Sequence, residues 1–154
     1  MGNVPPRTAP CWLAALVLVF AGFIGFAKPT EAFAGSPTRA ERILIRAVNH
    51  ARASHGVRKL SIGSAIQSGS HRWASYLLAR DAFFHGSLSS GVRENIAWLT
   101  CRSDWQKNIV RMWLNSSVHR SALLDRSARK MGVGVAKGRW EGWSCVRLTV
   151  ARFR

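Results

Sequence analysis

Three side chains of this sequence have the chemistry of a catalytic or metal-binding site: His85, Glu94 and His119. The first two lie in the stretch FFHGSLSSGVRENIA (83–97), which is otherwise rich in small and turn-forming residues. Two neutral imidazoles and a carboxylate can bind Zn²⁺ or a similar divalent cation, and the same trio can act as general acid and base. The spacing does not choose between these chemistries, because neither HExxH nor paired CxxC is present. A structural interpretation is also open, in which His85 and Glu94 pair to fix the loop and His119 caps or packs a short helix.

A serine nucleophile is a weaker interpretation of the same region. Ser116 and Ser117 lie near His119, but the chain has no GxSxG elbow, and no acidic residue suggests itself as the third member of a triad. The glycine patterns of nucleotide-binding loops are also absent, since MGVGV (131–135) lacks the final spaced glycine. The sequence therefore predicts a polar site without specifying its reaction.

Apolar spacing predicts the helices that position these residues. Thr38 can cap a helix with one apolar stripe, and this helix is expected to end at Gly56. A second helix is predicted over 64–80. Its core-facing residues are predicted to be Ile66, Trp73, Leu77 and Leu78.

Two further helices are predicted near His119. The sequence Ser103-Asp104-Trp105-Gln106 has the form of a capping box, so a helix should begin there. A short helix that carries His119 should follow and fray near Asp125. One face of the first of these helices is predicted to hold Trp105, Ile109, Met112 and Trp113.

The last part of the chain has the alternation of strands. Met131–Ala136 and Cys145–Val150 predict a hairpin with its turn within 138–142. Such a sheet needs a further strand, which we place around 94–98. Helices first and an antiparallel pair last indicate an α+β fold with a small sheet.

The N-terminus has the features of an export signal. Arg7 precedes an apolar run of 17 residues (11–27), and Ala32-Phe33-Ala34 has the small-x-small form of a signal-peptidase site. We therefore predict a secretory signal peptide over 1–34, a linker over 35–38 and a single domain over 39–154. An uncleaved membrane anchor is the alternative, because the run is barely long enough to cross a bilayer. The expected location is extracellular or periplasmic.

The chain is strongly basic. After residues 1–34 it holds 21 Lys or Arg and 6 Asp or Glu, which gives a formal charge of +15. Such a charge suits an anionic envelope polymer or lipid, and the export signal disfavours intracellular nucleic acid as a partner. Attachment to a membrane is expected only through an uncleaved N-terminus or surface attraction, and the protein is expected to be a monomer. The charge could also serve solubility alone.

Two cysteines, Cys101 and Cys145, remain after the signal peptide. Disulfides persist outside the cytosol, so a bridge between them is one expectation, and it would stabilise the domain by about 3–4 kcal/mol in the chain-entropy model. Two buried free thiols are the alternative that the sequence leaves open.

The order of short motifs resembles the CAP superfamily in its bacterial SCP-like branch, which includes cysteine-rich secretory proteins, antigen five and plant pathogenesis-related proteins. The resemblance covers nearly all of 39–153. The motifs are NHARASHG from Asn49, Trp73-Ala74, FFH ending at His85, RENIA from Arg93, MWLNSSVHRSALL from Met112 and MGVGVA from Met131.

The resemblance implies an α-β-α sandwich, with helices on both sides of a small antiparallel sheet and a cleft lined by two histidines and two acidic residues. His85, Glu94 and His119 match three of these four positions. The second family glutamate is missing, so the resemblance implies weaker cation binding here, with Asn115 or Ser116 supplying only a neutral oxygen. Arg93 also replaces the glycine of the family's GEN motif.

The resemblance does not imply one reaction, because proposals for family members range from lipid carriage to proteolysis. We expect a secreted binding module that engages an envelope component, a lipid or another anionic partner through the His/Glu cleft. A secreted hydrolase that uses the same histidines, with or without a metal, is the alternative from another class.

Overall fold

The computed structural model describes residues 36–154. The predicted signal peptide and Gly35 of the predicted linker lie outside the described residues. In the described part, no helix has both the length and the apolar character needed to cross a membrane. The elements are α1 (Arg39–Ser54), β1 (Ser61–Ile62), α2 (Ser64–Ala79), β2 (Arg93–Thr100), α3 (Trp105–Asn115), α4 (Ser117–Leu123), β3 (Lys130–Trp140) and β4 (Trp143–Phe153).

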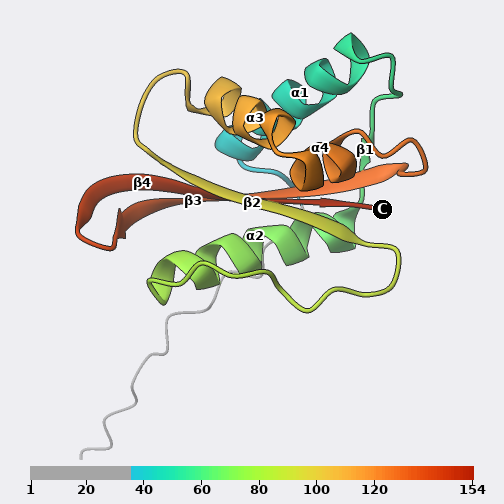
Figure 1. Ribbon diagram of the computed structural model, residues 1–154. Helices are drawn as coiled ribbons and strands as arrows, with labels where there is room; N and C mark the ends of the chain where they lie inside the picture. The colour runs from blue at the N-terminus through green and yellow to red at the C-terminus, as the bar shows by residue number, and fades with distance from the viewer. Residues whose placement is uncertain (1–35) are drawn as a thin grey trace, which may run out of the picture. The chain divides into compact units, whose positions relative to one another are not determined.

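The fold is α+β, with one sheet between two layers of helices (Figure 1). Helix α2 covers one face of the sheet, and α1, α3 and α4 cover the other. The strand order is β1-β3-β4-β2, and β4 pairs antiparallel with both neighbours. Strand β1 is parallel to β3, so the sheet is mixed and not purely antiparallel as predicted. Two residues are too few to show an alternating pattern, which is why the sequence did not reveal β1.

A capping box fixes the start of α1. The hydroxyl of Thr38 accepts from the Glu41 N–H (3.3 Å), and the Glu41 carboxylate accepts from the Thr38 N–H (2.7 Å). Glu41 is fully buried, and its carboxylate also contacts Gln67 Nε2 (3.2 Å) and His71 Nδ1 (2.7 Å) on α2. Gln67 in turn bonds both backbone groups of Val133 in β3. One buried carboxylate thus ties α1 to α2 and, through Gln67, to the sheet.

Helix α2 packs against β3 through its smallest side chains. A Cβ at Gly132 or Gly134 would collide with the backbone of α2, so glycine at both positions lets the helix lie directly on the strand. Trp73 and Leu78 are partly buried and pack against the core on this side of the sheet, as predicted, and Ile66 is also partly buried. The close approach of helix and strand favours small residues directly between them. The buried residues of α2 are Gln67, Ser70, Ala74 and Leu77.

The start of α3 differs from the predicted capping box. The helix begins at Trp105 with Asp104 at the N-cap position, and no side chain caps it. Ser103 lies in the turn before the helix, and the Asp104 carboxylate accepts from Arg102 (3.0 Å) instead. Met112 is also exposed, although it was predicted on the core face. The core on this side of the sheet is built from Leu44, Val48, Trp105, Ile109, Trp113, Leu123, Met131 and Phe153.

The predicted disulfide and hairpin are both present. Cys101 and Cys145 are bridged, with their Cα atoms 5.5 Å apart in space and their positions 44 apart in the chain. The bridge joins the segment just after β2 to β4, where the Cys101 N–H also donates to the Cys145 carbonyl (3.0 Å). The hairpin turns at Glu141 and Gly142, which both have positive φ, as a two-residue turn between twisted strands requires.

Candidate functional site

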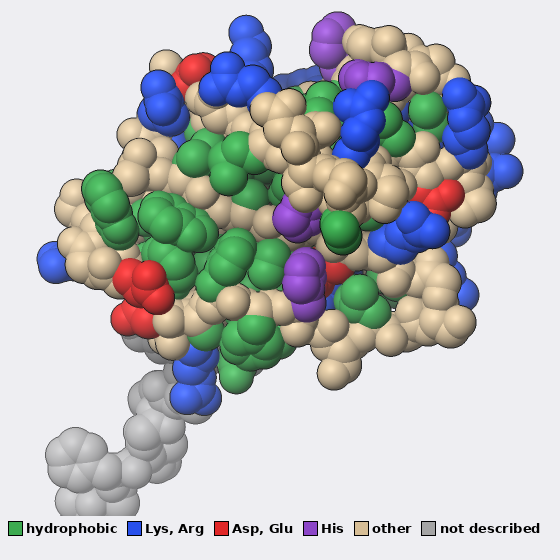
Figure 2. All heavy atoms as spheres, in the orientation of Figure 1, with side chains coloured by type: hydrophobic (Ala, Val, Ile, Leu, Met, Phe, Trp, Pro, Cys, Tyr) green, Lys and Arg blue, Asp and Glu red, His purple; other side chains and the backbone are tan. Residues whose placement is uncertain are grey.

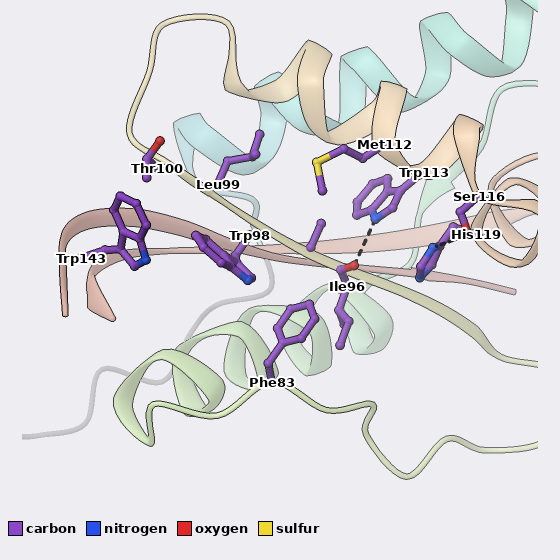
Figure 3. A pocket seen from close by; sticks show the side chains of 11 residues that line it. Phe83, Ile96, Trp98, Leu99, Thr100, Met112, Trp113, Ser116, His119 and Trp143 are labelled. Atoms are coloured by element: carbon purple, nitrogen blue, oxygen red, sulfur yellow. Dashed lines mark hydrogen bonds between the residues drawn. The ribbon is translucent and has the colours of Figure 1, made fainter. Parts of the chain in front are cut away.

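A cleft of about 640 Å³ lies beside β2, between α3 and the loop that follows α2 (Figure 3). Ser116 and His119 lie at one end of it, and Trp143 of the C-terminal hairpin lies at the other. The indole N–H of Trp113 donates to the Ile96 carbonyl (3.2 Å), which fixes α3 on β2. The apolar walls consist of Phe83, Ile96, Ala97, Trp98, Leu99, Met112, Trp113 and Trp143.

The structure brings His85 and Glu94 into direct contact. The carboxylate of Glu94 is fully buried, and its Oε1 lies 3.0 Å from His85 Nδ1 and 3.0 Å from the N–H of Gly86, which donates to it. Its Oε2 accepts from Arg152 Nε at 2.7 Å. The imidazole of His85 is 55% exposed, and because Nδ1 faces the carboxylate, Nε2 is the nitrogen left for a ligand. Glu94 therefore orients His85.

His119 lies close enough to His85 for the two imidazoles to interact electrostatically. Its Nδ1 is 2.9 Å from the hydroxyl of Ser116, and its carbonyl accepts from Asn95 Nδ2 (2.9 Å). Asn95 follows Glu94 on β2, so adjacent residues of one strand position both histidines. Figure 2 shows two histidine side chains next to each other near the middle of the view, beside a broad apolar patch.

Two effects lower the pKa of His119 below its usual value of 6.5. The larger is burial, which disfavours the imidazolium, and the smaller is the positive charge that His85 carries when protonated. His119 is therefore neutral at pH 7, so its ring can accept a hydrogen bond there. The unprotonated state results from the position of α4 against β2.

The residues of this site do not fit a metal centre. Both oxygens of Glu94 already face donors, and the guanidinium of Arg152 neutralises the carboxylate. Across residues 36–154, no group of three or more His, Cys, Asp or Glu side chains is arranged to hold a metal ion. The predicted trio comes together, but the carboxylate of Glu94 is held by His85, Gly86 and Arg152 and is not an open ligand.

Of the predicted cleft residues, only His119 and Ser116 line this cleft, and His85 and Glu94 lie beside it. Ser116 lines the cleft and contacts His119, whereas the structure places Asn115 along a different groove, between α1 and α3. Arg93, which stands at the glycine position of the GEN motif, pairs with Asp125 (3.3 Å). The sequence reasoning missed Arg152, because no pattern distinguishes it from the other basic residues of the chain.

The lowered pKa of His119 makes the stability of the fold depend on pH. As pH falls below about 6.5, the unfolded chain takes up a proton at this position before the folded protein does, so the free energy of unfolding decreases. The contribution is present above that pH and is lost as pH falls through the folded pKa. We expect His119→Asn to make urea unfolding less sensitive to acid than in the unmodified protein.

His50→Asn is the control for the loss of an imidazole, because His50 is exposed on α1. Urea midpoints would be measured from neutral pH into the acid range. Equal acid sensitivity in the unmodified protein and in His119→Asn would contradict the lowered pKa of His119.

Comparison with known proteins agrees with this geometry. The family model CAP, described as the cysteine-rich secretory protein family, matches residues 45–146. The chain belongs to the CAP family. This confirms the resemblance seen in the sequence and the α-β-α sandwich that it implies.

Solved structures share the CAP fold at low sequence identity. An outer surface protein from Borrelia burgdorferi is 15% identical over 77% of this chain and 96% of its own, with a TM-score of 0.55. BmVAL-1 is 16% identical over 80% of each chain, with a TM-score of 0.57. MpPR-1i is 16% identical over 77% of this chain and 88% of its own, also with a TM-score of 0.57. A comparison with curated proteins gives no match. At such identities the likeness concerns the fold alone.

Proposed function

We propose that this CAP-domain protein is a secreted binding module whose cleft takes an anionic, lipid-like component of a cell envelope. The observation that carries the proposal is the layout of the cleft. An apolar trough runs from Trp143 to His119, which lies beside His85, so a long apolar group and a polar head would meet matching surfaces (Figure 3).

The apolar wall of the cleft is open to solvent. Phe83, Met112 and Trp143 are 44%, 45% and 51% exposed, although all three line the same cleft. Large apolar side chains that gather at one exposed place commonly mark a binding surface. Covering them with an apolar chain would remove their area from water, which supplies most of the expected binding free energy.

The charge of the site favours an anion. Arg152 compensates the charge of Glu94, so the cleft presents no free carboxylate that would repel an anionic head group. His85 is exposed and offers its Nε2 edge to such a group. The basic surface of the whole domain adds attraction over a longer range, which salt screens.

A hydrolase is supported less well by the same geometry. The hydroxyl of Ser116 does contact His119 Nδ1, as a nucleophile contacts its base. However, no carboxylate among residues 36–154 bonds His119, and Glu94 serves His85 instead. The chain of nucleophile, base and orienting acid is therefore incomplete, and binding is the function that we favour.

Vesicle binding tests the proposal directly. The protein should sediment with vesicles that contain phosphatidylglycerol more strongly than with pure phosphatidylcholine, and added salt should weaken this binding. Trp143→Ala and Phe83→Ala should each reduce the affinity by about tenfold, because each removes apolar area that the ligand would cover.

Ile62→Ala is the matched control, since Ile62 is 43% exposed but lies on β1, away from the cleft. It should leave the affinity unchanged. Equal losses for Ile62→Ala and Trp143→Ala, or binding that does not depend on anionic lipid, would refute the role of the cleft. Hydrolysis of the lipid that disappears in a His85→Ala, His119→Ala variant would favour the enzyme instead.

A further inference from the structure

A further pocket lies beside the loop that carries His85. Its volume is about 460 Å³, and it is formed by α2, by Gly86 and Ser87 of the loop, and by Arg152 of β4. It shares no lining residue with the apolar cleft described above. Glu94 lines neither pocket and lies between them, with its Oε1 facing His85 and the Gly86 N–H and its Oε2 facing Arg152.

Arg152 brings unused hydrogen-bond donors to this pocket. A guanidinium has five N–H groups, and only the Nε–H of Arg152 has a partner, which is Glu94. Within residues 36–154, no group accepts a hydrogen bond from its Nη1 or Nη2. The side chain is nevertheless only 14% exposed. Donors in such a sheltered position are well placed to bind an anion.

The guanidinium of Arg152 is also held in place. Its Cζ lies 5.9 Å from the ring centroid of Trp73, and the ring of Trp73 stacks on Tyr76 at 5.1 Å. With Nε fixed by Glu94 and the group resting near an aromatic ring, the Nη atoms need little reorganisation to bind a ligand. Preorganised donors bind more tightly than mobile ones.

Two glycines keep the Nη atoms uncovered. A Cβ at Gly69 would lie 3.2 Å from Arg152 Nη1, and one at Gly86 would lie 2.6 Å from Nη2. Gly69 is inside α2, where glycine destabilises a helix relative to alanine. A glycine at this position therefore costs helix stability while leaving room beside the guanidinium.

The charge around the pocket is positive. Arg72 lines the rim and is exposed, and no acidic side chain lines the pocket. The carboxylate of Glu94 is fully buried behind Arg152. Ser87 adds a hydroxyl that can donate to an oxygen of a ligand.

We propose that this pocket is a second binding site, for a single oxyanion group of the carboxylate or phosphate class. Nη1 and Nη2 of Arg152 bind the oxyanion as a fork, and Arg72 and Ser87 contact it from the rim. The site is separate from the apolar cleft and does not depend on the function proposed for that cleft.

Titration of the full chain with inorganic phosphate, and separately with acetate, tests this site. The ¹H–¹⁵N resonances of Arg152 Nε and of the Gly86 amide should shift and saturate. Saturation with phosphate alone identifies a phosphate group as the natural ligand, and saturation with acetate alone identifies a carboxylate. Absence of saturable shifts with both probes would overturn the proposal.

Two variants localise the binding without touching Glu94. Arg72→Ala should weaken the affinity by about tenfold, the effect of one charged contact. Gly69→Ala should weaken the affinity several-fold, because the added methyl group crowds Nη1. It should also raise the midpoint of thermal unfolding, because alanine favours the helix. Arg46→Ala removes the same charge from the exposed side of α1 and should leave the affinity unchanged.

Equal weakening by Arg72→Ala and Arg46→Ala would mean attraction by net charge only, and would overturn the proposal. So would an unchanged affinity in Gly69→Ala. A variant that fails to fold is recognised by its spectrum, and Gly69→Ala is expected to fold more stably, so the test does not depend on a destabilised protein.

Discussion

Glu94→Gln is expected to lower the free energy of unfolding by about 3–5 kcal/mol, because it removes one partner of a buried ion pair. The amide has nearly the shape of the carboxylate, so little volume changes. However, its NH₂ group must face either Arg152 Nε or the donors at His85 and Gly86, and each of these places a donor against a donor. Arg152 would then lie in a sheltered position without its anion.

The same substitution should also weaken binding in the apolar cleft, because His85 loses the group that orients it. Unfolding in urea and vesicle sedimentation would be measured on the same preparation. Glu141→Gln is the matched control: Glu141 lies exposed in the hairpin turn, and its change should move the unfolding free energy by less than about 0.5 kcal/mol. A loss no larger for Glu94→Gln than for Glu141→Gln would show that the network does not stabilise the fold.

Arg52→Met should destabilise the protein by a similar amount, about 3–5 kcal/mol. Arg52 is fully buried and donates from Nε to the Arg58 carbonyl (2.8 Å), from Nη1 to the Leu123 carbonyl (2.6 Å) and from Nη2 to the Asp125 carbonyl (3.0 Å). Methionine fills much of the space but leaves three carbonyls without donors. Burial also lowers the pKa of Arg52, which nearby Asp125 partly offsets.

This second change reaches the site through α4, because Arg52 ties α1 to the end of the helix that carries His119. Arg58→Met is its control, since Arg58 is exposed and only its backbone carbonyl takes part in the network. The free energy of unfolding of both variants would be measured by chemical denaturation. Similar stability of the two would mean that the carbonyls find other donors and that Arg52 is replaceable.

The sequence predicted the elements that local signals define. The Thr38 cap, the hairpin and the strand around Glu94 all lie where they were expected, since each depends on residues close together in the chain. The start of α3 was misplaced, because a capping box is a short pattern and Ser103 is held in a turn. The direct contact of α2 with β3 could not be predicted, because it depends on Gly132 and Gly134, which are far from α2 in the chain.

The site, too, could be predicted from the sequence only in part. Side-chain chemistry and motif order both predict His85, Glu94 and His119, and the structure brings these three together. Their electrostatic state could not be predicted from the sequence. It depends on Arg152, which stands opposite Glu94 only because β2 and β4 are paired in that register.

By itself, the sequence determined the class of fold, the family and the identity of the polar trio, because these depend on residue types and on their order along the chain. Only the tertiary structure decided that Glu94 is neutralised and that Arg152 has free donors in a separate pocket. The physical reason is that charge compensation and burial act over distances of a few ångströms, between residues that the chain places far apart.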